Sequence, residues 1–114
     1  MQIERIDVGE IMSQAVVHGD IVYLAGQVSS DSGDVAGQTQ AVLDKIDSLL
    51  ARCGTQKTRI LSATIYLADI STFGEMNEVW KKWVPVGATP ARATVEAKLA
   101  TPDFLVEIVV VATR

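Results

Sequence analysis

Glu107 is the residue of this chain that most suggests chemistry, because it is the one charge inside the apolar run from Phe104 to Ala112. A lone carboxylate in such a run costs several kcal/mol unless it is paired or protonated. Arg92 is a suitable partner, since the small residues between Pro90 and Thr94 leave room for its guanidinium to bind a carboxylate bidentately. The pair predicts either a salt bridge that closes an interface or an anion site with a carboxylate beside it.

Both residues are expected on one face of a β-hairpin. Residues 91–99 alternate between polar and apolar types, and residues 104–112 are rich in β-branched types, so both segments are predicted strands. A short loop over 100–103 would make them antiparallel neighbours, and that register places Glu107 on the face of Arg92. A slip of one residue would separate the two side chains.

The elements that position this hairpin follow from the hydrophobic periodicity, which changes between 2 and 3.6 residues along the chain. Thr72 and Glu75 also fit a capping box in front of the second helix. Besides the two strands above, the pattern predicts strands at Ile3–Ile6, Gln14–His18, Ile21–Gly26 and Arg59–Ala68, and helices over Val35–Cys53 and Phe73–Trp83.

This order predicts an α+β fold, a mixed sheet with two helices on one face. The strand over 104–112 is apolar on both sides and should therefore be buried on both. We expect another copy of the chain to cover the second face, with the mixed side of residues 59–68 (Ser62, Thr64 and Tyr66) in the interface.

Composition narrows the class of protein further. The chain has 114 residues, 48% of them apolar and 21% charged, which predicts a single globular domain over 1–114. A net charge of −4 disfavours general nucleic-acid binding, and one histidine and one cysteine leave little for a zinc site. With neither a membrane-length apolar run nor a secretory signal pattern, a cytoplasmic location is expected.

Several short motifs identify a family. The most specific is PARATVE, from Pro90 to Glu96, followed by VEI around Glu107; LAGQV (Leu24–Val28), Ala68-Asp69 and FGEMN (Phe73–Asn77) support it. On these motifs, which extend over essentially the whole chain, the sequence resembles the Rid family, the reactive-intermediate deaminases formerly called YjgF-type proteins. Within that family it is most similar to the short YoaB-like branch.

The resemblance implies a chorismate-mutase-like fold and a homotrimer with three ligand clefts between subunits. It also implies hydrolysis of 2-imino acids and their enamine tautomers, such as 2-aminoacrylate, to 2-keto acids and ammonia, without a cofactor or metal. The partners it implies are these small imino and keto acids; neither a nucleic acid nor a membrane is expected as a partner, on the charge and composition given above.

The site residues carry over one at a time. Arg92 matches the arginine that binds the substrate carboxylate, and Glu107 matches the glutamate that positions or activates water. Asn77 and Gly26 match an asparagine and a glycine of the cleft. The sequence departs from the family pattern at Met12, where many deaminases have a tyrosine, and at Thr94, where they have a cysteine.

Two other functions stay open on the residues alone. The same Arg92 cleft would serve a non-catalytic trimer that binds small carboxylates as a sensor or regulator. A ribonuclease, an activity with which some relatives are credited, is disfavoured by the sequence pI of about 4.8 and by the lack of a basic stripe.

Overall fold

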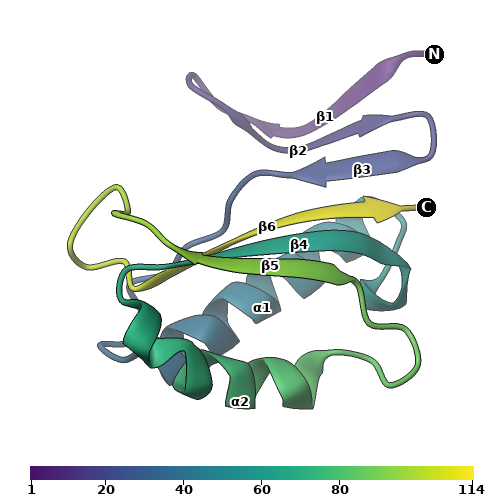
Figure 1. The fold of residues 1–114 in the computed structure, drawn as a ribbon. Helices are drawn as coiled ribbons and strands as arrows, with labels where there is room; N and C mark the ends of the chain where they lie inside the picture. Colours follow the sequence, from purple (N-terminus) through teal and green to yellow (C-terminus); the bar gives the residue numbers. More distant parts are fainter.

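A six-stranded mixed sheet with two helices on one face forms the molecule (Figure 1). The computed structural model describes all 114 residues. The predicted fold class and element order are confirmed. The elements are β1 (Ile3–Val8), β2 (Ser13–His18), β3 (Ile21–Leu24), α1 (Val35–Arg52), η1 (Lys57–Arg59), β4 (Ile60–Leu67), η2 (Ile70–Thr72), α2 (Phe73–Trp83), β5 (Ala91–Glu96) and β6 (Val106–Thr113).

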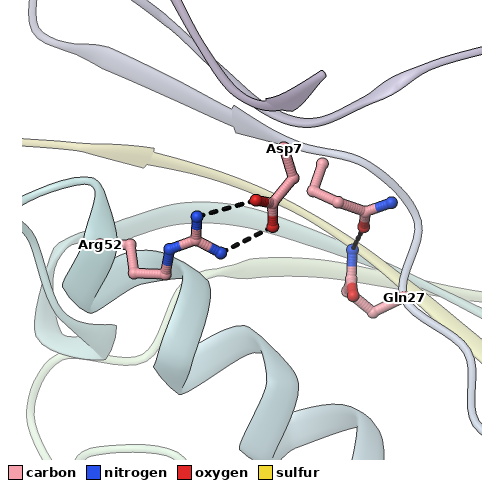
Figure 2. Close-up of polar contacts among 4 residues, drawn as sticks. Asp7, Gln27 and Arg52 are labelled. Carbon is pink, nitrogen blue, oxygen red and sulfur yellow. Dashed lines mark hydrogen bonds and ion pairs between the residues drawn. The ribbon is translucent and has the colours of Figure 1, made fainter. Parts of the chain in front are cut away.

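The strands lie in the order β1-β2-β3-β6-β4-β5. The first three form an antiparallel meander, and the predicted hairpin of β2 and β3 is confirmed. Its turn contains Gly19 with φ of 61°, a conformation that glycine adopts without strain. The edge strand β1 is also tied to α1, because Arg52 donates to both carboxylate oxygens of Asp7 at 2.6 and 2.9 Å (Figure 2).

The hairpin predicted for the last two strands is wrong. β5 pairs in parallel with β4, Ala63 lying opposite Arg92, while β6 lies between β3 and β4 and is antiparallel to both. The reason is the helix between β4 and β5: a strand, a helix and a second strand that return to the same sheet edge make a parallel crossover unit. β5 ends at Glu96, so residues 97–105 form a long connection across the end of β4 instead of a tight turn.

The core lies between the sheet and the helices. Every second residue of β6, from Val106 to Ala112, is fully buried on the helix face, together with the apolar stripe of α1. The opposite face has no such cover in one chain. On it Val109 and Val111 are half-buried, Tyr23 is 48% exposed and Val95 43% exposed. The expectation of burial on both sides thus holds for the helix face alone within the single chain.

The start of α2 differs from the predicted capping box. No side chain caps the helix at Thr72, whose hydroxyl donates to the carbonyl of Asp69 at 2.6 Å instead. Glu75 turns toward α1 and accepts from the backbone N–H of Ala36 at 3.0 Å. The N–H groups in the first turn of a helix have no partners within the helix, and the helix dipole makes this end partly positive. A carboxylate is therefore favoured there. Glu75 therefore joins the two helices.

Candidate functional site

Arg92 lies on the helix face of the edge strand β5, above α2. Its Nη1 donates to Oδ1 of Asn77 at 2.7 Å, and its Cζ lies 5.3 Å from the ring centroid of Trp80 and 5.5 Å from that of Phe73. The three ion pairs of the chain involve other residues, so this guanidinium has no carboxylate partner. Burial lowers the pKa of Arg92, which means that its positive charge is partly desolvated. A guanidinium held in this way has donors left for an anion.

Thr94 lies two residues further along the same strand and on the same face. Its Oγ1 is buried and has no hydrogen-bond partner within the chain. Buried polar groups are nearly always paired, so this unpaired hydroxyl, on the same strand face as Arg92, makes Thr94 a second candidate for the site. The structure thus brings together three of the predicted site residues, Arg92, Asn77 and Thr94.

Phe73 and Trp80 are neighbours of Arg92 that the sequence interpretation did not assign to the site. Trp80 is buried, as expected for a core residue, yet its ring also packs against the guanidinium. The signal is present in the sequence: Phe73, Asn77 and Trp80 are spaced by four and three residues, which places them on one face of a helix. The aromatic rings hold the planar guanidinium while Asn77 fixes one edge of it.

Glu107 lies on the other face of the sheet. Residues paired across strands share a face, and Glu107 is paired with Tyr66, which is paired with Val95. Arg92 is paired with Ala63, which lies on the buried helix face. The predicted shared face of Arg92 and Glu107 is therefore wrong. The cause is the parallel pairing of β5 described above, which replaces the hairpin register on which the expectation depended. One chain keeps the two side chains on opposite sides of its sheet.

Glu107 has its own surroundings. The predicted polar partner is absent, since no hydrogen bond or ion pair within the chain involves its side chain. It packs against Gly26, where a Cβ would overlap its Oε2. Together with Tyr66, Val109 and the start of the 97–105 connection, Glu107 lines an open groove of about 310 Å³. The structure thus brings together a second set of predicted residues, Gly26 and Glu107.

Met12 belongs with neither set by direct contact. It lies in the turn between β1 and β2 and is 56% exposed. Gln27, which follows Gly26, donates to Oε1 of Gln14 at 3.0 Å and so ties the start of β2 to the end of β3 (Figure 2). Met12 is therefore at the same end of the sheet as Gly26, four strands away from Arg92 in the sheet order.

No three His, Cys, Asp or Glu side chains are grouped in a way that suits a metal ion. None of the helices combines the length and apolarity needed to cross a bilayer.

Comparison with known proteins gives a consistent result. The family model described as Endoribonuclease L-PSP matches residues 3–114. A RutC family protein of Haemophilus ducreyi is 48% identical over 96% of this chain and 95% of its own length, and RutC family protein YoaB of Escherichia coli is 41% identical over 98% of each. A crystal structure of a YjgF family member from Neisseria meningitidis is 43% identical, covers 100% of this chain and 96% of its own, and superposes with a TM-score of 0.99. YyfA of Yersinia pestis, of the conserved Rid family, is 31% identical with a TM-score of 0.88, covering 94% of this chain and 90% of its own.

Proposed function

The chain belongs to the family of RutC, YjgF and Rid proteins, and from that premise we propose that it hydrolyses 2-imino acids and their enamine tautomers to 2-keto acids and ammonia. The observation that carries the proposal is the environment of Arg92. Its guanidinium is anchored to Asn77, packed against two aromatic rings and left without an acidic partner. A small carboxylate is the ligand that such a group binds best.

The residues supply a complete set of roles for this reaction. Arg92 binds the substrate carboxylate and so fixes the neighbouring C=N carbon, with Thr94 as an additional hydrogen-bond donor. Water adds to that carbon to give a carbinolamine. The C–N bond then breaks as the nitrogen takes a proton and leaves as ammonia, while the oxygen forms the keto group. Glu107 relays both protons of the water to the nitrogen, one as the water adds and the other as the hydroxyl of the carbinolamine becomes the keto group.

Arg92 and Glu107 can meet in one site only if two copies contribute. We propose that Arg92, Asn77 and Thr94 of one copy face Gly26, Glu107 and Met12 of the next copy in a homotrimer. The half-buried valines of β6, with the mixed side of β4 beside them, support this assembly, because one chain leaves this face without cover. Sedimentation that shows a stable monomer of 12.2 kDa at working concentration would contradict it.

A non-catalytic carboxylate-binding protein is the second candidate. One observation favours it: a single chain presents Arg92 on one face and keeps Glu107 on the other. Binding of a keto acid needs only the first set of residues, whereas hydrolysis needs both.

The test combines turnover with binding. A serine dehydratase generates 2-aminoacrylate, pyruvate release is followed with and without the protein, and calorimetry measures the binding of pyruvate. Arg92→Ala should lose both turnover and binding, and Arg92→Lys should also lose most of both, because a point charge does not reproduce the bidentate fork. Glu107→Gln should keep binding and lose about 10²-fold in rate.

The outcomes separate the candidates. Pyruvate binding that depends on Arg92, with no acceleration of imine hydrolysis, favours the non-catalytic protein. Normal binding and turnover in Arg92→Ala rejects the site. A parallel incubation with single-stranded RNA tests the activity for which the family model is described.

A further inference from the structure

Gln38 is a buried polar residue outside the candidate site. It lies three residues after Val35 on α1, and the residue is 1% exposed. Its Nε2 donates to the carbonyl oxygens of Ser32 at 2.9 Å and of Asp103 at 2.8 Å, and its Oε1 accepts from the N–H of Leu105 at 2.8 Å. Both amide hydrogens and the amide oxygen are therefore used, and only an amide of this length offers that combination.

These hydrogen bonds hold the end of the connection between β5 and β6. Leu105, two residues before Glu107, donates its N–H to Gln38 and accepts at its carbonyl from the N–H of Ala68 at 3.0 Å. The connection over 97–105 also forms one wall of the groove that contains Glu107. The side chain of Gln38 thus fixes the place where β6 enters the sheet, just before Glu107 is paired with Tyr66.

We propose that Gln38 is a positioning residue for Glu107, holding the 97–105 connection so that the carboxylate stays beside Gly26. The proposal depends on the function proposed above. None of the hydrogen bonds of Gln38 involves Arg92 or Thr94, and the strand that holds these two residues, β5, is paired with β4. Loss of Gln38 should therefore disturb the Glu107 half of the site and leave the carboxylate-binding half intact.

Two substitutions separate positioning from simple structural support. Gln38→Met keeps the length and removes all three hydrogen bonds. Gln38→Glu keeps an oxygen that can accept from the N–H of Leu105. The ionised carboxylate, however, has no hydrogen to donate to the carbonyl oxygens of Ser32 and Asp103. When protonated, it regains one donor, and burial beside carbonyl oxygens favours that form. The matched controls are Gln40→Met and Gln40→Glu, at an exposed glutamine on the same helix.

The experiment measures kcat for imine hydrolysis and the Kd for pyruvate in the assembled protein, with folding checked by circular dichroism at each pH. For Gln38→Met we expect kcat to fall by up to ~10²-fold, as for a misplaced catalytic group, with an unchanged Kd for pyruvate. For Gln38→Glu we expect kcat relative to wild type to rise as the pH is lowered from about 8 to about 6. The Gln40 variants should show neither effect.

Each result of these measurements supports or overturns the role proposed for Gln38. A folded Gln38→Met variant with wild-type kcat, or one in which pyruvate binding weakens in parallel with kcat, overturns the proposal. So does a folded Gln38→Glu variant with wild-type kcat over the whole pH range, a result that also decides the question if Gln38→Met does not fold. A wild-type protein that binds pyruvate but does not accelerate imine hydrolysis refutes the proposed function itself, and the role of Gln38 with it.

Discussion

Replacing Gly26 with alanine should displace Glu107 while leaving the fold intact. A Cβ at this position would overlap Oε2 of Glu107 and would lie 2.9 Å from its Cδ and 3.2 Å from its Cγ. The backbone itself accepts alanine, because Gly26 is not among the residues with positive φ. The obstacle is the end of a flexible side chain, so the carboxylate should turn away and the strands should stay in place.

The structure sets the size of the effect. To reach ordinary van der Waals contact, Oε2 has to move by more than about 1 Å, since carbon and oxygen do not approach more closely without repulsion. A shift of that size in a catalytic group lowers kcat by up to ~10²-fold. A side chain forced away from its preferred rotamer costs about 0.5–1.5 kcal/mol, so the free energy of unfolding should fall by no more than that.

The assay is the pyruvate-release measurement, together with chemical denaturation. Gly33→Ala is the matched control, because a Cβ at Gly33 meets nothing within 4 Å. In a Glu107→Ala background, Gly26→Ala should cause no further loss of rate, since the group that it displaces is gone. Wild-type kcat in a folded Gly26→Ala protein would refute the predicted displacement or the catalytic role proposed for Glu107.

Three further predictions concern other parts of the chain. Thr94→Val removes an unpaired buried hydroxyl, so the free energy of unfolding should be unchanged or slightly raised in denaturant melts. Pyruvate affinity by calorimetry should fall by about 10- to 100-fold, the range expected for a hydrogen bond to a charged group. Met12→Tyr should shift the kcat/KM preference from imines with larger aliphatic side chains toward smaller or more polar ones; an unchanged profile would place Met12 outside the cleft. The hydrogen bond from Arg52 lowers the pKa of Asp7 below 3.8, so the stabilisation by this pair is fully present above the usual aspartate pKa and is lost as the pH falls through the lowered value. Arg52→Met should therefore have a lower denaturation midpoint than wild type near neutral pH, and the difference should close as the pH falls through the lowered pKa of Asp7.

The sequence allowed much of the fold to be predicted, because most of the signals are local. The stripe of α1 and the alternation along β4 depend on residues a few positions apart, and both elements lie within one or two residues of their predicted bounds. The pairing of β5 is different. Alternation indicates a strand but does not name its neighbour, and a short loop suggested β6 as the partner. The helix between β4 and β5 was the better guide to the topology.

The candidate site was predictable in residue type and less so in arrangement. Arg92 and Glu107 are unusual in their sequence contexts, and Asn77 and Thr94 do lie with Arg92. The face on which Glu107 lies depends on a strand register that no local pattern determines. Gln38 gave no signal at all, because a glutamine in a helix is ordinary until the loops that it binds have been placed around it.

The opposite placement of Arg92 and Glu107 has a consequence for inheritance and for mixtures of subunits. If the proposed site is shared, each copy serves two sites, giving its arginine to one and its glutamate to another. A single defective copy then inactivates a site that it shares with a neighbouring copy, although the sequence of that neighbour is intact. Conversely, two inactive proteins, Arg92→Ala and Glu107→Gln, regain function when their subunits are mixed, because random assortment in a ring returns both groups to about one site in four.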